Sequence, residues 1–272
     1  MIHDKNCILR GPCRTAGDPQ TCNAKCPLYI NVHGSEGTGG IVHRANIPQD
    51  YRLMTLNESP IKQIERVVRR YENEEGETEV EAEPMYGVIS DYVSTFRRQF
   101  DEEVTQIKSV YLYSVSPGTG KTTTAAVIAN EYLLRHYIGS RIRGLNTLDR
   151  PVFFLSMNRW HSEYYAFNRR NVPEHIAKPA AASYYEAHRI AKSVPFLVID
   201  DIGVREGSDA FNMDLLDLVD HRVSNLLPTV YTSNVPIEDL RDMYDEKGRI
   251  FDRVRDMCIP VEFNGDSKRG IR

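Results

Sequence analysis

The run VYLYSVSPGTGKTTTAAVIANEYLL constrains the fold more than any other part of this sequence. Apolar, β-branched and aromatic residues lead into a short loop with two glycines, and an amphipathic helix begins at Lys121. Gly118 and Gly120 permit backbone angles that let amide groups point inward at phosphate oxygens. The start of the helix adds a partial positive charge. Strand, loop and helix in this order predict a phosphate-binding loop in an α/β protein.

The side chains of this loop have expected tasks. Lys121 is placed for the β- and γ-phosphates of a nucleotide, and the Thr122 hydroxyl for Mg2+. The pattern departs from the usual one at its first glycine, which is Val115 here. The half that surrounds the phosphates is complete, and we expect it to bind nucleotide through Pro117, Gly118, Thr119, Gly120, Lys121, Thr122 and Thr123.

The run FLVIDDIG predicts the acidic partner of the phosphate loop. Four apolar residues form a buried strand whose end carries Asp200 and Asp201. Asp200 is expected to hold Mg2+ through Thr122 or through its water shell. Asp201 is then the candidate that polarises the attacking water. The alternative is that both carboxylates cap the next turn, but their pairing with a phosphate loop favours the catalytic interpretation.

Two later segments add candidate residues. PTVYTSN ends at Asn234, and a strand beside the aspartate strand would bring this amide to the γ-phosphate, where it could orient water. The alternative is an ordinary turn residue. GRIFDRVRDM predicts a basic helix that carries Arg249, Arg253 and Arg255. Charged surface is the default for such a helix, and the alternative is an arginine supplied to a neighbouring subunit's nucleotide.

Short apolar strands alternate with helical stretches from the phosphate-loop strand onward. This alternation indicates a parallel sheet with helices on both faces. The five expected strands are SVYLYSV, PVFFLSM, PFLVIDD, PTVYTSN and IPVEF. Before them we expect a helix that Ser59-Pro60 opens and that continues to Tyr71. The seven glutamates between residues 72 and 83 repel one another and predict a surface loop, and a further helix is expected over about 87–104.

Four of the five cysteines fall near the start of the chain with the spacing C-x5-C-x8-C-x3-C, at Cys7, Cys13, Cys22 and Cys26. Turn-forming glycines and prolines between them allow the thiolates to converge. A segment this short cannot bury a core of its own, so tetrahedral zinc would have to hold it folded. An iron–sulfur cluster uses the same ligands, and disulfides or free thiols are the simpler alternatives. His3, His33 or His43 could replace one ligand.

The composition is that of a soluble globular protein, with 272 residues, 41% hydrophobic residues and a net charge of −4. This net charge does not indicate a protein that binds nucleic acid, although the surface could still carry a local basic patch. No apolar stretch approaches the length that crosses a bilayer, and no secretory signal opens the chain. We therefore expect a cytoplasmic protein.

The motifs divide the chain into three parts. We expect an N-terminal zinc-binding domain over 1–44, a linker with a helix and an acidic loop over 45–84, and an ATPase domain over 85–272.

The motifs SPGTGKTTTAA, LVIDDIG, TSN and the arginine-bearing helix, in this order, resemble an AAA+ ATPase of the DnaC/DnaI helicase-loader type. The resemblance covers about residues 45–272. It implies a five-stranded parallel sheet flanked by helices, without the helical lid of many AAA+ proteins. Lys121 and Thr122 match the Walker A pair, Asp200 and Asp201 match Walker B, and Asn234 matches sensor 1. The resemblance further implies Arg253 as arginine finger, with Arg249 as second choice, and Arg269 as sensor 2.

The resemblance also implies cofactors and partners. The cofactors are ATP, Mg2+ and Zn2+. The partners are a hexameric replicative helicase of the DnaB type, which the resemblance implies is bound by the N-terminal domain over 1–44, together with single-stranded DNA and further copies of the chain in a ring or spiral. The stretch between the second and third strands carries Arg159, Arg169, Arg170 and Lys178 for phosphates, and Trp160, Tyr164, Tyr165 and Phe167 for stacking, although aromatic residues at helical spacing are more often core.

Two other functions compete with helicase loading. One is a transposition helper of the IstB type, whose similar ATPase module coats duplex DNA. The cysteine-bearing front segment favours the loader. The other is a P-loop kinase of small molecules, and the arrangement of Asp200, Asp201 and Asn234 speaks against it.

Overall fold

A seven-stranded sheet in the order β2-β1-β7-β3-β6-β5-β4 forms the centre of the molecule. The structure is a computed structural model that describes residues 3–101, 106–203, 207–244 and 248–265. All pairings among the last five strands of this order are parallel, which confirms the predicted parallel sheet. These five strands are β3 (Ser109–Tyr113), β4 (Val152–Ser156), β5 (Phe196–Ile202), β6 (Thr229–Ser233) and β7 (Cys258–Asn264).

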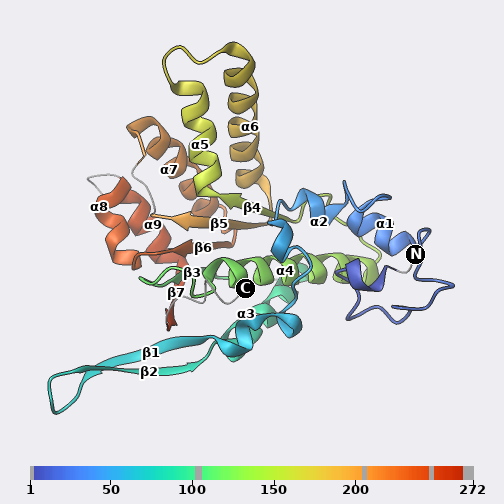
Figure 1. Cartoon of the computed structure of the whole chain (residues 1–272), viewed down its shortest axis with the longest axis horizontal. Coiled ribbons are helices and arrows are strands. Elements are labelled where there is room, and N and C mark those ends of the chain that lie inside the picture. The colour runs from blue at the N-terminus through green and yellow to red at the C-terminus, as the bar shows by residue number, and fades with distance from the viewer. Residues whose placement is uncertain (1–2, 102–105, 204–206, 245–247, 266–272) are drawn as a thin grey trace.

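Helices cover both faces of this parallel sheet, so that alternate side chains of each strand enter different cores (Figure 1). Phe196 and Val198 of β5 pack toward α4 (Lys121–Ile142), and Leu197 and Ile199 pack toward the other face. Strands that are buried on both faces appear in the sequence as continuous apolar runs, such as FLVI here. The helices of the second face are α5 (Met157–Asn168), α6 (Glu174–Ser193), α7 (Asp209–Ser224), α8 (Leu240–Tyr244) and α9 (Arg249–Met257).

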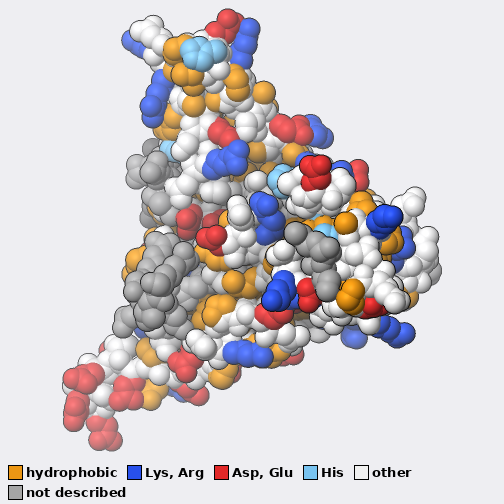
Figure 2. Space-filling model, turned by 45° about the vertical axis from the view of Figure 1, so that its right-hand side comes forward, with side chains coloured by type: hydrophobic (Ala, Val, Ile, Leu, Met, Phe, Trp, Pro, Cys, Tyr) orange, Lys and Arg blue, Asp and Glu red, His pale blue; other side chains and the backbone are white. Residues whose placement is uncertain are grey.

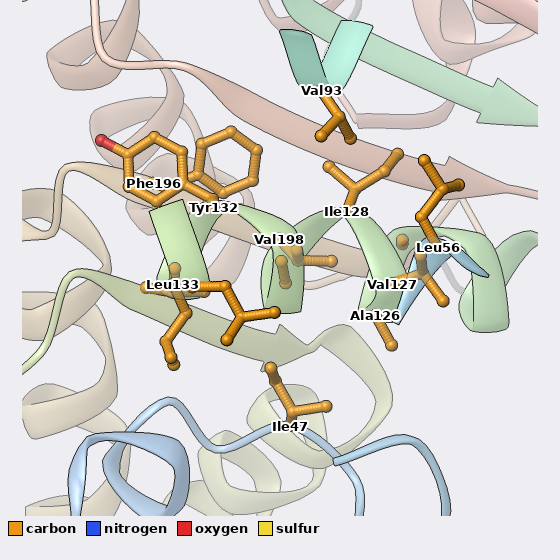
Figure 3. Close-up of a cluster of buried hydrophobic side chains, with 14 of the residues drawn as sticks. Ile47, Leu56, Val93, Ala126, Val127, Ile128, Tyr132, Leu133, Phe196 and Val198 are labelled. Atoms are coloured by element: carbon orange, nitrogen blue, oxygen red, sulfur yellow. The ribbon is translucent and has the colours of Figure 1, made fainter. Parts of the chain in front are cut away.

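The α4 face also receives the N-terminal part of the chain, which continues the same apolar core. Figure 3 shows Ile47 and Leu56 beside the apolar side chains of α4. Ile47 is fully buried, and the Ala45 carbonyl accepts a hydrogen bond of 2.8 Å from the Phe154 amide of β4. The helical segments of this part are α1 (Pro27–His33), α2 (Ile41–Arg44) and 3-10 turns at Asp4–Asn6, Gln49–Tyr51, Leu56–Glu58 and Pro60–Gln63. The segment predicted as a linker is thus packed on the core from Ala45 to Ile64.

Asn130 fixes this segment to α4. Its side-chain amide donates hydrogen bonds of 2.8 Å to the carbonyls of both Tyr51 and Met54. The side chain is fully buried, so these two carbonyls replace the water that the amide loses on folding. The boundaries at residues 44 and 84 stay predictions.

The helix predicted from Ser59 to Tyr71 and the acidic loop after it are both wrong. A 3-10 turn over Pro60–Gln63 is followed by β1 (Glu65–Glu72), which pairs antiparallel with β2 (Thr78–Pro84). The sheet therefore has seven strands, two more than predicted. The sequence pattern of a helical stripe and that of a strand both fit Val67, Val68 and Tyr71. The β-branched and aromatic side chains of these residues favour the strand.

A tight turn within the glutamate run lets the second half of the run fold back as strand β2. The Asn73 amide donates to the Glu77 carbonyl at 2.9 Å, and Gly76 adopts φ 77°, which closes a tight turn. The glutamates that follow alternate along β2 with Thr78, Val80 and Ala82. Charged side chains on an edge strand discourage pairing with another sheet.

The hairpin leaves the sheet soon after it starts. Only Glu65 and Arg66 pair with β7, and the register shifts between Val67 and Arg69. From there the two strands project away from the rest of the molecule (Figure 1). The base of the hairpin is anchored, because Ile64 and Met85 at its two ends are buried and the Met85 amide donates to the Ile64 carbonyl at 2.9 Å.

The helix expected over about 87–104 is shorter. It comprises α3 (Met85–Ser94) and a 3-10 extension over Thr95–Phe100. Residues 102–105 lie outside the described part of the chain. Among the described helices, none combines the length and the apolar character needed to cross a membrane.

Candidate nucleotide-binding site

The loop that joins β3 to α4 has the backbone that phosphate binding needs. Gly118 and Gly120 adopt φ 80° and 105°, angles that residues other than glycine rarely adopt. At Gly120 there is also no space for a side chain, because a Cβ atom would lie 2.6 Å from Ile64 Cδ1. The segment before the β1–β2 hairpin thus covers the loop at the start of α4.

Lys121 is buried and turns back onto this loop. Its ammonium donates to the carbonyls of Ser114 and Ser116 at 3.3 and 3.2 Å, and lies 3.5 Å from the Thr119 hydroxyl. The positive charge therefore lies inside the curve of the loop, where anionic oxygens could replace the two carbonyls as its partners.

Asp200 lies at the end of β5 and faces the start of α4. Its Oδ1 accepts a hydrogen bond of 2.7 Å from the Thr232 hydroxyl, and the nearby Thr122 hydroxyl helps to lower the pKa of this carboxylate. Burial raises the pKa of Asp200 to about 6, against the opposing effect of the Thr232 hydrogen bond. The structure thus brings Lys121, Thr122 and Asp200 into one site, where the Thr122 hydroxyl and the Asp200 carboxylate are oxygen donors of the kind that would hold Mg2+.

A β-bulge directs the two aspartates. Tyr231 pairs with Ile199 while Ser233 pairs with Ile202, so β5 has one extra residue opposite Thr232. The extra length is taken up at Asp201, whose φ is 64°. The Asp201 amide donates to the Thr232 hydroxyl at 2.9 Å, and this hydroxyl in turn donates to Asp200. One threonine therefore holds both residues of the acidic pair.

The side chain of Asp201 points toward α5. Its Oδ2 accepts a hydrogen bond of 3.2 Å from the Asn158 side-chain amide in the first turn of that helix. Asn234 directly follows β6, which lies between β3 and β5. The carboxyl ends of these parallel strands share one edge, so half-buried Asn234 lies at the same edge as the phosphate loop and the aspartates.

Three residues of this site were missed from the sequence, namely Ile64, Asn158 and Thr232. Ile64 and Asn158 carry no signal that the sequence alone would single out. Thr232 does carry one, because it is a polar residue within an apolar strand and directly precedes the Ser233-Asn234 pair. Such a residue must find a hydrogen-bond partner inside the fold, and Asp200 is that partner.

The candidate arginines lie elsewhere. Arg253 on α9 forms an ion pair of 2.8 Å with Asp220 on α7, and half of its side chain is exposed. Arg249 opens the same helix. Arg253 therefore lies outside the set of residues around Asp200, as an arginine that acts on a neighbouring subunit's nucleotide would. Arg269 lies outside the described residues.

The four N-terminal cysteines line one small cavity of about 20 Å3. Burial raises the pKa of the Cys7 thiol, and the nearby thiolates of the other three raise it further. However, within residues 3–101 and the other described ranges, no group of three or more metal-ligating side chains has the arrangement of a metal site. His33 is an unsuitable substitute, since its Nε2 accepts a hydrogen bond of 3.0 Å from the Ile8 amide.

The aromatic residues proposed for stacking on DNA belong to the core instead. Trp160 and Tyr164 are almost fully buried between α5 and α6, and the Trp160 indole donates to the Tyr184 carbonyl at 3.2 Å. Tyr165 and Phe167 are partly buried against the same cluster. Of the basic residues, Arg159 and Lys178 pair with Glu163 and Glu174 on their own helices. Trp160 and Tyr164 are therefore core residues, as the alternative interpretation of these aromatic residues expected.

Comparison with known proteins agrees with this architecture. The chain is 28% identical over 235 residues to the replicative helicase loader DnaC of Escherichia coli K12, and the match covers 85% of this chain and 82% of that protein. The DnaC of Shigella flexneri matches equally. A solved structure of a candidate primosome component from Streptococcus pyogenes serotype M3 has 21% identity and a TM-score of 0.51, and covers 84% of this chain and 97% of the other. No protein-family model matches.

The solved structure supports the fold, and the DnaC proteins supply the sequence relationship over most of the chain. In this chain the parallel sheet carries a phosphate loop after β3 and an acidic pair at the end of β5. The chain therefore has the α/β fold of a P-loop protein and is similar over most of its length to the replicative helicase loader DnaC.

Proposed function

We propose that the protein is an ATP-dependent loader of a replicative helicase. The observation that carries this proposal is the proximity of Lys121 and Thr122 of the phosphate loop to Asp200 of β5, whose pKa both residues lower, in a chain related to DnaC. That proximity joins the expected phosphate-binding and metal-binding halves of an ATPase. The relationship to DnaC supplies the class of partner, and it favours the loader over a transposition helper.

The site residues would divide the work of ATP hydrolysis. The loop amides and Lys121 would bind the β- and γ-phosphates, in exchange for the carbonyls that Lys121 now contacts. Thr122 and Asp200 would hold Mg2+, which neutralises charge that develops on the phosphates. Asp201 would accept a proton from the attacking water, and Asn234 would orient that water.

Assembly would complete this site. Arg253 lies half exposed beside Asp220 of α7. From there it would reach the nucleotide of a neighbouring copy and stabilise the charge of the transferred phosphoryl group. Single-stranded DNA and a DnaB-type hexamer are the proposed partners. In the N-terminal segment, Cys7, Cys13, Cys22 and Cys26 are proposed to hold zinc, with the shared cavity as support.

The experiment combines a variant with a binding assay. Lys121→Ala is expected to lower ATP turnover by about 100-fold or more, because it removes a charge that stabilises the transition state. Co-purification with candidate replicative helicases, with and without ATP, identifies the partner. Undiminished turnover by the variant would refute the phosphate-loop assignment. Coating of duplex DNA without affinity for any helicase would instead favour the transposition helper.

A further inference from the structure

The projecting hairpin carries a surface with the chemistry of a binding element. We define the arm as residues 69–81, beyond the register shift of β1 and β2. Arg69 pairs with Glu81 and Tyr71 pairs with Glu79, and these four side chains share one face because cross-strand partners point the same way. Tyr71 is 42% exposed, and its hydroxyl donates to Glu79 at 2.8 Å. This face therefore presents an aromatic ring bordered by the carboxylates of Glu79 and Glu81, with the Arg69 guanidinium opposite Glu81.

The free end of the arm is strongly acidic. Figure 2 shows acidic side chains gathered at the tip, with basic groups closer to the base. The glutamates of the arm are Glu72, Glu74, Glu75, Glu77, Glu79 and Glu81. An isolated two-stranded hairpin is at best marginally stable in water. A partner that covers one face of the arm would stabilise it, and the charge of the arm requires a basic partner.

The same chain has a groove with the matching chemistry. A cavity of about 520 Å3 lies between the N-terminal segment, residues 55–58, the 3-10 turn after α3 and the second half of α4. Phe100, Leu134 and Ile138 give it an apolar surface. Three guanidinium groups border it, from Arg97, Arg135 and Arg143, and we call it the arginine groove.

The charge of the arginine groove is only partly compensated from within. Glu58 binds the Arg10 guanidinium through both oxygens. Glu131 accepts a hydrogen bond of 2.9 Å from the neutral Leu56 amide and keeps its negative charge, which is smaller than the combined positive charge of the three arginines. In the part of the chain that the structure describes, Arg97, Arg135 and Arg143 form no ion pair with a carboxylate. The groove is thus suited to an acidic ligand.

The floor of the groove is preformed. A Cβ atom at Gly139 would lie 2.4 Å from the Phe100 ring, so this ring rests directly on the backbone of α4. The Arg143 guanidinium lies 4.4 Å from the centre of the same ring. A ring that is held in this way loses little further freedom on binding, which favours affinity. The groove would accept an aromatic side chain against Phe100 while carboxylates reach the arginines.

Arm and groove lie at different ends of the molecule. In Figure 1 the arm extends to one end of the longest axis, and the N-terminal segment and the end of α4 lie toward the other. A chain therefore cannot fill its own groove. We propose that the Tyr71–Glu79–Glu81 face of one copy binds in the arginine groove of a second copy. Such a contact joins different surfaces, so its repetition gives a ring or an open filament.

A charge swap tests the proposal, in sedimentation velocity without nucleotide or DNA. Glu79→Arg with Glu81→Arg, and separately Arg97→Glu with Arg135→Glu, are each expected to weaken self-association by about tenfold or more. A mixture of the two variants is expected to associate again, because each reversed surface then meets its opposite. Tyr71→Ala is expected to weaken association without a change of charge, and high salt is expected to weaken that of the natural chain.

The matched control reverses two exposed charges away from both surfaces, Glu174→Lys with Glu186→Lys on α6, and is expected to associate as the natural chain does. Unaltered helical content and melting temperature verify that the variants fold. The proposal is overturned if both reversed variants keep full self-association, or if their mixture fails to associate. Loss of single-stranded DNA binding by the groove variant, with self-association intact, would overturn it in favour of nucleic acid. None of these outcomes depends on ATP turnover.

Discussion

At the residue scale, Asp200 shows how function opposes stability. Its carboxylate is only 7% exposed and has a pKa of about 6, against an ordinary value of 3.8. The folded state therefore binds a proton more readily than the unfolded state between these two values. Stability from this group is present below about pH 4 and is lost as the pH rises through 6. Above pH 6 the ionised carboxylate is kept at a cost, which a bound divalent cation would offset.

We therefore predict that Asp200→Asn stabilises the chain in metal-free buffer. The gain is expected to reach up to about 3 kcal/mol at pH 8 and to be roughly halved at pH 5, as measured by urea denaturation. Magnesium-dependent ATP turnover should be lost. Asp149→Asn is the matched control, because its carboxylate is 90% exposed and its neutralisation should change stability little. A variant less stable than the natural chain at pH 8 would contradict the prediction.

At the element scale, the N-terminal part consists of two pieces with different supports. Residues 45–64 are fixed by the Ala45 hydrogen bond to β4 and by the contacts of Asn130. The cysteine-bearing piece before α1 has mostly turns, and contributes few buried side chains besides Ile8 and Leu9. A piece with so few apolar contacts needs a further constraint, and metal ligation by the four thiolates would provide it.

Removal of the proposed zinc ion should therefore loosen one piece and spare the other. With a strong chelator, amide hydrogen exchange is expected to rise at least about tenfold in residues 7–26, since the four thiolates would lose the ion that they are proposed to share. Exchange in residues 45–64 should stay unchanged and serves as the internal control. Metal analysis of the untreated chain should return about one zinc per chain. Full protection of residues 7–26 in a chain shown to be metal-free would exclude the zinc site.

At the scale of the whole molecule, the nucleotide site and the arginine helix belong to different surfaces. Lys121 and Asp200 lie at the carboxyl edge of the sheet, whereas Arg253 lies on the outer face of α9 against Asp220. A complete ATPase site would then need two copies. The ion pair of Arg253 is solvent-exposed, so its loss should cost less than about 1 kcal/mol of folding stability.

Arg253→Ala should consequently bind ATP nearly as the natural chain does, yet lose assembly-dependent hydrolysis by about 1,000-fold or more. Binding is measured by nucleotide titration, and hydrolysis in the assembled state with helicase and DNA. Arg255→Ala is the control on the same helix, because Arg255 lies over the Phe251 ring and pairs with Asp252. Persistent hydrolysis by the assembled Arg253 variant would place the finger elsewhere.

The sequence alone determined the five parallel strands and the positions of the phosphate loop and acidic strand. These features depend on local signals: an apolar strand, glycines at left-handed angles and a helix start are adjacent in the chain. Periodicity failed at residues 59–83, where the same residues fit a helical stripe and a strand. The pairing of Glu65–Glu72 with Thr78–Pro84 decided that case, and pairing is a contact between segments that no single segment encodes.

Only the tertiary structure decided which neighbours complete the site and which residues become core. Thr232 holds both aspartates because β6 lies beside a bulge of β5, and Ile64 closes over Gly120 because the hairpin base is buried there. Trp160 became core because α5 pairs with α6. The physical reason is common to all three: a motif encodes its own backbone, whereas burial and hydrogen-bond partners depend on segments that are distant in sequence.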